Sequence, residues 1–363
     1  MPETEGASRR SRRAGHDPHS PDARERRRNR WVLITALSLI GVLAVGGLAT
    51  VLILQSRLDS NVERIADPFD GLPSRPPATE RDEREDQPMT LLVLGSDSRI
   101  SAGDPSQWEA GGQRTDTIML IHLPAERDAA YVMSIPRDSW VEIPGHGTHK
   151  INAAFSLGGP ALTVQTIEQL TGVRVDHFAM TDFESFTEVT DELGGVLITL
   201  RQDLRVGDRT LAAGEQHLMN GEEALTYVRQ RMNLARGDFD RVQRQQAWFR
   251  AIFARMRNEQ TLQNPTKSYP FLDSVTRSVA FDEAFDRDVM NDLVDRARNL
   301  GSVDISFFTV PIQGTGRSAD GQSIVVLDEE PFDRLMAAVR EDAVGEYLQE
   351  HPDDVDILPP VAP

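Results

Sequence analysis

The chain has 363 residues, which is enough for one large domain or two of ordinary size. Its 39% of hydrophobic residues suits a globular body with polar appendages, and the absence of cysteine excludes disulfides and thiolate metal sites. The net charge of −18 is uneven: residues 1–31 carry nine Arg and five Asp or Glu, a net +4, so the remainder carries −22. Such an acidic body is a poor nucleic-acid binder, and any phosphate site in it needs a local concentration of arginine.

The N-terminal part of the chain predicts a membrane anchor. Residues 1–31 are polar and Arg-rich, which indicates a disordered tail. Residues 32–54 contain no charged residue, and about 20 helical residues span a bilayer core of roughly 30 Å, so we expect one transmembrane helix there. A cleaved signal peptide is the alternative, although its apolar region is usually shorter. The flanking arginines predict a single-pass type II protein of the cytoplasmic membrane, with the N-terminus in the cytoplasm and the C-terminal body outside.

The rest of the chain predicts a tethered α/β domain. Residues 55–88 are charged and Pro-containing, as expected of an extracytoplasmic linker. We expect the folded domain at 89–345, followed by an acidic, Pro-containing tail at 346–363. Strand and helix signals alternate within the domain, which favours helices on both faces of a sheet. Short apolar runs predict strands at 89–95, 116–123, 130–135 and 196–200, and helix signals begin at Pro160, near Asn220 and at 239.

Two aspartates follow or open predicted strands, where α/β folds place ligands. Asp97 and Arg99 come directly after the strand at 89–95, and Asp116 enters the next strand beside Arg114. A carboxylate beside an apolar strand is costly unless it is paired or bound to a metal. Asp97 and Asp116 could therefore share a Mg²⁺ ion, which takes oxygen ligands and substrate phosphates. The alternatives are ordinary turn chemistry around Asp97 and a plain Asp–Arg ion pair at Asp116.

Further along the chain, cationic residues become concentrated. Arg137 follows the strand at 130–135, and Lys150 is one of only two lysines; either could simply form a surface ion pair. The strongest candidate cluster lies further along, in residues 229–245. An extended segment there, followed by a helix at 239–257, would bring its side chains together. Arginine forks bind phosphate oxygens and stay charged when partly buried, although a solvated charged helix is the alternative. The cluster consists of Arg229, Arg231, Asp238, Arg241, Arg244 and Gln245.

Several well-known catalytic motifs are absent from the sequence. It contains no Walker A motif, no GxGxxG after a strand, no HExxH and no GxSxG. The eight histidines show no metal-binding spacing, so we expect His122, His146, His149 and His177 to be structural or exposed.

Taken together, these segments resemble the LytR-CpsA-Psr (LCP) family of cell-envelope glycopolymer transferases, and the expected anchor fits the type II topology of that family. The resemblance spans about residues 89–255, with a stretch at 100–113 that is longer than usual in the family. The matching segments are LLVLGSDSR (91–99), RTDTIMLIHL (114–123), SIPRDSWVEIPG (134–145), HKINAAFSLGG (149–159), VDHFAMTDFESF (175–186), DELGGV (191–196), LMNGEEAL (218–225) and YVRQR…GDFDRVQRQQ (227–246).

The resemblance implies an α/β fold with a central mixed β-sheet and helices on both faces. It implies Mg²⁺-dependent transfer of a glycan phosphate from a polyprenyl pyrophosphate carrier, held in a long hydrophobic pocket, to peptidoglycan. Asp97 and Asp116 match metal-linked carboxylates of the family. Asp238 and Gln245 match polar residues that orient the arginines. The residues that match positions around the pyrophosphate are Arg99, Arg137, Lys150, Arg229, Arg231 and Arg241.

Phosphoryl transfer depends mainly on positioning and charge neutralisation, which an arginine cluster and a metal supply. A sugar hydroxyl of peptidoglycan would attack in line, with Asp97 as a candidate proton acceptor. The rival hypotheses are a non-catalytic polyprenyl-phosphate sensor or scaffold, a pyrophosphatase and a transcriptional regulator; the acidic body argues against DNA binding by the last. The sequence leaves open which glycopolymer is transferred.

Overall fold

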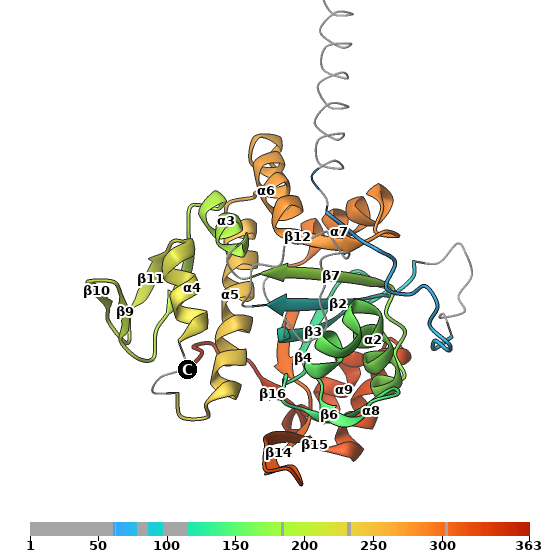
Figure 1. Ribbon diagram of the computed structural model, residues 1–363. Coiled ribbons are helices and arrows are strands. Elements are labelled where there is room, and N and C mark those ends of the chain that lie inside the picture. The colour runs from blue at the N-terminus through green and yellow to red at the C-terminus, as the bar shows by residue number, and fades with distance from the viewer. Residues whose placement is uncertain are drawn as a thin grey trace, which may run out of the picture. The chain divides into compact units, whose positions relative to one another are not determined.

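An eight-stranded mixed β-sheet forms the centre of the fold (Figure 1). The structure is a computed structural model that describes residues 61, 63–77, 86–96, 115–182, 185–230, 234–301 and 304–363. From one edge of the sheet to the other, the strands are β1 (Arg64–Ile65), β12 (Val279–Asp282), β7 (His177–Asp182), β2 (Met89–Ser96), β3 (Thr115–Leu123), β4 (Ala130–Ser134), β13 (Ile305–Thr309) and β16 (Asp356–Ile357).

The middle of the sheet combines both kinds of strand pairing. β2, β3 and β4 follow one another along the chain and pair antiparallel, whereas β7 and β13 flank them in parallel with β2 and β4. The apolar run of β2 is continuous because helices cover both faces of the sheet. Leu92 and Leu94 pack into the cluster on one face, and Leu91 packs into a cluster on the other.

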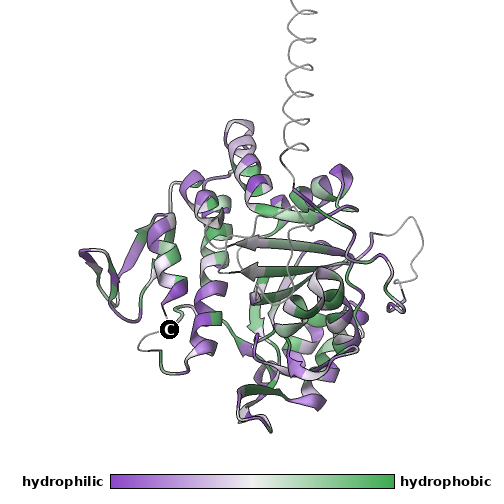
Figure 2. Cartoon of the chain, in the orientation of Figure 1, coloured by the Kyte–Doolittle hydropathy of each residue, from purple (hydrophilic) through white to green (hydrophobic). Residues whose placement is uncertain are grey.

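Helices lie on both faces of the sheet, as the sequence predicts. On one face, α2 (Ala153–Thr171), α8 (Glu329–Arg340) and α9 (Val344–Glu350) share a core with the strands. On the other face, α5 (Asp238–Asn258) and α7 (Arg287–Asn299) contribute to two further clusters. Figure 2 shows hydrophobic residues along the central strands, while much of the outer surface of the helices is hydrophilic.

A second hydrophobic core lies beside the sheet and shares α5 with it. The fully buried Trp248 of α5 belongs to this second core, whereas Ala247 of the same helix packs toward the sheet. Helix α5 therefore connects the two cores. The other elements of the second core are α3 (Ser185–Glu192), α4 (Gly221–Arg229), α6 (Pro265–Ser278) and the hairpin strands β8 (Val196–Thr199), β11 (Gln216–Met219), β9 (Leu204–Val206) and β10 (Arg209–Leu211).

Two small hairpins flank the segment that follows β4. One consists of β5 (Trp140–Ile143) and β6 (Gly147–Lys150), and the other of β14 (Ile312–Arg317) and β15 (Ser323–Leu327). An isolated bridge joins Ser139 to Val325, so the two hairpins are connected through the chain just after β4. A 3-10 helix, Pro352–Asp354, precedes β16.

Most of the predicted elements are confirmed, with bounds that differ by one or two residues. The α2 region is interrupted where Gly159 has φ 63° and ψ −154°; the helix resumes at Pro160 and ends before the left-handed Gly172, as predicted. The capping box between Asn220 and Glu223 at the start of α4 is also confirmed. The helix predicted at 239–257 is α5.

The folded body is larger than the expected 89–345. Ile65 is buried in the core, and Arg75 forms an ion pair of 2.7 Å with Glu168 of α2, so part of the expected linker packs onto the body. The expected tail at 346–363 contributes the end of α9 and β16 and is therefore a packed segment. The predicted tail at 1–31 and the predicted membrane span at 32–54 lie outside the described residues. Within the described part of the chain, no helix is long and apolar enough to cross a bilayer.

Candidate active site

Three neighbouring strands bring polar residues to the same end of the sheet. The backbone of Ser96, the last residue of β2, pairs with Thr115, the first residue of β3. β4 runs antiparallel to β3, so the end of β4 also lies beside the start of β3. Asp116, near the start of β3, and Arg137, just after β4, therefore meet although 20 residues separate them in the sequence.

An ionic network of four side chains forms at this point. The Arg137 Nη1 atom donates a hydrogen bond to Asp116 Oδ1, and Arg137 Nη2 lies 3.4 Å from Asp238 Oδ1. Arg241 Nη2 lies 2.8 Å from the same Asp238 oxygen and 3.8 Å from Asp116 Oδ1. Two guanidinium groups are thus held between two carboxylates, one from the sheet and one from the first turn of α5.

The network is buried on one side and open on the other. The side chain of Arg241 is 3% exposed and that of Asp116 is 10% exposed, whereas Arg137 and Asp238 reach 20% and 30%. Arg137 Nε is shielded from solvent and donates no hydrogen bond to any described residue. Charges in such a place interact more strongly than on an open surface, and an unused guanidinium donor favours an anionic ligand with several oxygens.

The charge of Arg137 is secured by its neighbours. Burial by itself lowers the pKa of the Arg137 guanidinium, but the carboxylates of Asp238 and Asp116 outweigh burial and raise the pKa above its ordinary value. The side chain therefore remains a fixed positive charge at and well above neutral pH.

A third cation joins the network through Asp138. Lys150, the last residue of β6, places Nζ 3.0 Å from Asp138 Oδ1, and Arg137 Nε lies 3.8 Å from Asp138 Oδ2. The hairpin that carries Lys150 thus places its ammonium group next to the arginines. Asp138 lies in the segment SIPRDSWVEIPG, but no role was predicted for it. Its position directly after Arg137 is the one feature of the sequence that could have indicated this role.

Polar contacts to the sheet hold the first half of α5 in place. Gln245 Oε1 accepts a hydrogen bond of 2.8 Å from the Thr117 hydroxyl of β3. Gln246 Nε2 donates one of 2.9 Å to the Ser134 hydroxyl of β4. The family resemblance implies an orienting role for Gln245 but none for Gln246 or its strand partner. Both contacts lie one turn beyond Arg241 and fix the height of α5 above the network.

The structure does not bring Arg244 into this network. Its guanidinium points toward α4 and the C-terminal segment, where Nη1 donates to Gln230 Oε1 at 2.9 Å and Nε donates to the Pro363 carbonyl at 2.5 Å. Arg229 is exposed on the last turn of α4. Asp97, Arg99 and Arg231 lie outside the described residues, so their predicted roles stay predictions.

The carboxylates present here fit a magnesium ion that shares a bound phosphate. Asp116 is the described member of the predicted magnesium pair, and Asp238 lies on the other side of the arginines. Magnesium commonly takes one or two carboxylates and obtains its other ligands from phosphates and water. Among the described residues there is no group of three or more potential metal ligands, so this part of the chain holds no complete all-protein cage.

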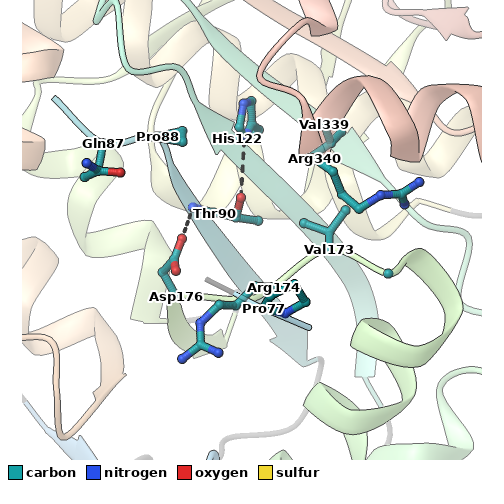
Figure 3. Close-up of a pocket in the computed structure, with 11 residues that line it drawn as sticks. Pro77, Gln87, Pro88, Thr90, His122, Val173, Arg174, Asp176, Val339 and Arg340 are labelled. Atoms are coloured by element: carbon teal, nitrogen blue, oxygen red, sulfur yellow. Dashed lines mark hydrogen bonds between the residues drawn. The ribbon is translucent and has the colours of Figure 1, made fainter. Parts of the chain in front are cut away.

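A separate cavity of about 410 Å³ lies at the opposite end of β2 (Figure 3). Thr90 and His122 meet there, with the Thr90 hydroxyl 3.2 Å from His122 Nδ1. His122 is 2% exposed, and its Nε2 atom lies 2.8 Å from Asp342, beyond the end of α8. These contacts confirm a structural role for His122. His177 is similarly paired with the buried Asp282.

Comparisons with known proteins agree with the fold and with the family resemblance of the sequence. Residues 62–341 match the LytR_cpsA_psr family. The cell wall biosynthesis protein LcpA of Corynebacterium glutamicum is 32% identical over 277 residues, which are 66% of this chain and 53% of that protein. The chain therefore spans about half the length of that relative. A polyisoprenyl-teichoic acid–peptidoglycan teichoic acid transferase, TagU of Bacillus subtilis, is 28% identical and is covered over 97% of its length by 87% of this chain.

Solved structures of the same fold are also similar. The structure of TagT bound to LI-WTA superposes with a TM-score of 0.58 at 25% identity, covering 76% of this chain and 98% of that one. The structure of YwtF (TagT) with bound octaprenyl pyrophosphate lipid superposes with a TM-score of 0.56 at 23% identity, with the same coverage, and supports the fold alone. On the extent of the family match, the chain belongs to the LytR-CpsA-Psr family.

Proposed function

We propose that this protein transfers a glycopolymer phosphate from a polyprenyl pyrophosphate carrier to peptidoglycan during cell wall assembly. The observation that carries the proposal is the network of Asp116, Arg137, Asp238 and Arg241, buried on one side and open on the other. Relatives named as cell wall biosynthesis proteins and teichoic acid transferases support the substrate class.

The guanidinium groups would act on the pyrophosphate. Arg137 and Arg241 would neutralise its oxygens, and Lys150 would add a third positive charge from the β6 hairpin. A hydroxyl of the acceptor sugar attacks the phosphorus that bears the glycan. The P–O bond to the polyprenyl phosphate breaks, a phosphodiester forms, and the hydroxyl proton goes to a base, for which Asp97 remains the candidate. Fixed cations stabilise the leaving polyprenyl phosphate more than the bound substrate, which lowers the barrier.

The carboxylates would have two tasks. Asp238 holds Arg137 and Arg241 at a common oxygen, so the two guanidiniums are presented at a fixed separation. Asp116, together with Asp97, would hold Mg²⁺. When bound, the metal would supply additional charge neutralisation to the phosphate oxygens.

Membrane anchoring fits the same substrate. A polyprenyl carrier stays in the bilayer. A helix at 32–54 would hold the active site close to the same membrane and so raise the effective concentration of the carrier at the site. We propose that the body lies on the outer side of the cytoplasmic membrane, as the arginines before this segment suggest.

The test uses the full-length chain in detergent with a short-chain polyprenyl pyrophosphate-linked sugar, with and without Mg²⁺ and peptidoglycan fragments. Metal-dependent release of polyprenyl phosphate, with sugar phosphate joined to the fragment, is the expected result. Release of sugar phosphate into water would indicate a pyrophosphatase. Tight binding without release, for several glycans, would indicate a sensor and overturn the proposal.

A further inference from the structure

We propose that Arg244 is a positioning residue, which caps the end of α4 and thereby fixes the segment that carries Arg229. The sequence alone groups Arg244 with the phosphate-binding arginines. Its contacts in the structure assign it a different task, because its guanidinium is bound by groups that take no part in phosphate binding.

The environment of Arg244 is unusual for an arginine. The residue is 2% exposed, and its Nε donates to a main-chain oxygen of Pro363 at 2.5 Å. Burial lowers the pKa of the Arg244 guanidinium as a result. A buried charge is costly to keep, so the hydrogen bonds of Arg244 have to offset the loss of its hydration.

Two of these hydrogen bonds reach the C-terminal end of α4. Arg244 Nη1 donates to the Tyr227 carbonyl at 3.4 Å and to Gln230 Oε1 at 2.9 Å, and the guanidinium carbon lies 4.8 Å from the centre of the Tyr227 ring. Carbonyls at a helix C-terminus have no partner within the helix, and the helix dipole is negative there. Arg244, which lies on α5, therefore caps the C-terminal end of α4.

The position of this cap relates it to the site. Arg229 is the final residue of α4, and Arg241 lies one turn before Arg244 on α5. The two helices that carry these proposed phosphate ligands are thus tied together by a side chain placed between them. Loss of the cap would free the end of α4 while Arg241 kept its own contacts to Asp116 and Asp238.

Helix α5 offers a matched control six residues after Arg244. Arg250 is half-buried on α5 and, like Arg244, binds the C-terminal segment, donating to the Pro359 and Pro360 carbonyls at 2.8 Å each. None of its described hydrogen bonds reaches α4. Arg250→Met therefore removes a half-buried arginine and a contact with the C-terminal segment, but leaves the cap of α4 intact.

The first test compares Arg244→Met and Arg250→Met in the full-length protein by hydrogen exchange. In Arg244→Met, backbone amides at the end of α4, including the Gln230 N–H that donates to Thr226, should exchange at least about tenfold faster, as expected when a terminal turn opens locally. In Arg250→Met they should exchange as in the wild type. Equal exchange in both variants would overturn the proposal. This readout does not depend on any enzymatic activity.

The second test rests on the proposed function and measures transfer. Arg244→Met should lower kcat by roughly 10- to 100-fold with KM nearly unchanged, because a displaced arginine costs more in the transition state than in the ground state. Arg250→Met should retain kcat within about twofold, as a substitution away from the site does. Arg244→Lys, which keeps the charge, should recover part of the loss.

The remaining outcomes separate the two proposals. If a short-chain polyprenyl pyrophosphate binds Arg244→Met more weakly in calorimetry, in proportion to the loss of kcat/KM, Arg244 is a substrate ligand and the proposal is wrong. If Arg244→Met does not fold, Gln230→Ala removes one contact of the cap without exposing the arginine and should give the same exchange pattern. If the wild type transfers nothing, the proposed function fails, and the exchange comparison still decides the role of Arg244.

Discussion

Arg137 and Arg241 approach the same oxygen atom, Oδ1 of Asp238, at 3.4 and 2.8 Å, although one follows a strand of the sheet and the other lies on α5. The shared oxygen fixes the distance between two cations, one that follows the sheet strand β4 and one on helix α5. It also means that the protein, before any substrate binds, neutralises these cations with its own carboxylates. A pyrophosphate that enters would compete with Asp116 and Asp238 for donors that are already aligned.

Replacement of Arg241 by Ala should abolish most of the transfer. We expect kcat/KM to fall at least about 100-fold, because one fixed charge that stabilises the transition state is removed. The domain should still fold, since Arg137 continues to pair with Asp116. Steady-state kinetics and thermal unfolding measure the two effects. Arg334→Ala is the matched control, because Arg334 forms ion pairs with Glu330 and Asp354 far along the chain and is 38% exposed. Equal activities of the two variants would exclude Arg241 from the chemistry.

Replacement of Asp116 by Asn should weaken the binding of the magnesium ion on which transfer depends. The amide keeps the shape of the side chain but removes the negative charge, so the Mg²⁺ concentration for half-maximal activity should rise at least about tenfold. A Mg²⁺ titration of the initial rate gives this value. Asp138→Asn removes a carboxylate that pairs with Lys150 instead, and we expect it to leave the Mg²⁺ requirement unchanged. An identical titration curve for wild type and Asp116→Asn would rule out a metal at this carboxylate.

Replacement of Gln245 by Leu should destabilise the protein. Gln245 is 2% exposed and accepts a hydrogen bond from Thr117, so the substitution leaves a buried hydroxyl without its partner, at a cost of about 1–3 kcal/mol. Urea unfolding measures the loss. Gln349→Leu, on the exposed face of α9, makes the same chemical change without breaking a buried contact and should stay within about 0.5 kcal/mol of the wild type. A loss of similar size in both variants would show that the contact to β3 contributes little.

Tyr227 should make the protein less stable in alkali. Burial raises the pKa of its hydroxyl to about 12, from 10.0 for a free tyrosine. Between these two pH values the unfolded chain loses the proton and the folded protein retains it, so the free energy of unfolding decreases as the pH rises. Tyr227→Phe removes the ionising group and keeps the ring beside Arg244, so its stability should decline less over this range. Urea unfolding at pH 8, 10 and 11 is the measurement; parallel declines in both proteins would contradict the assignment.

The sequence predicts the centre of the fold well because local pattern decides it. The runs 89–95, 116–123 and 130–135 are strongly apolar and bounded by polar turns, and they correspond to β2, β3 and β4 almost residue for residue. The strands β12, β13 and β16 were not predicted. They are short, and each pairs with a strand or segment far away in the sequence, so no local pattern identifies them.

In the candidate site, too, local pattern predicts some features, while others depend on contacts between distant parts of the chain. Helical periodicity places Asp238, Arg241 and Gln245 on one stripe of the predicted helix, with Arg244 alongside. Periodicity does not tell where along that stripe the helix stops facing the sheet. Gln245 faces β3, whereas Arg244 already faces α4, and only the packing of α4 against α5 determines this. The roles predicted for Asp97, Arg99 and Arg231 await a test.

The consecutive pairing of β2, β3 and β4 also has a consequence for how the protein folds. Asp116, Arg137 and Lys150 lie within 35 residues on this meander and the hairpin after it, so their contacts close short loops and can form early. Asp238 and Arg241 arrive about 90 residues later, with α5. A nascent chain would therefore display half of the ionic network, with Arg137 not yet bridged to Asp238, until α5 docks and completes it.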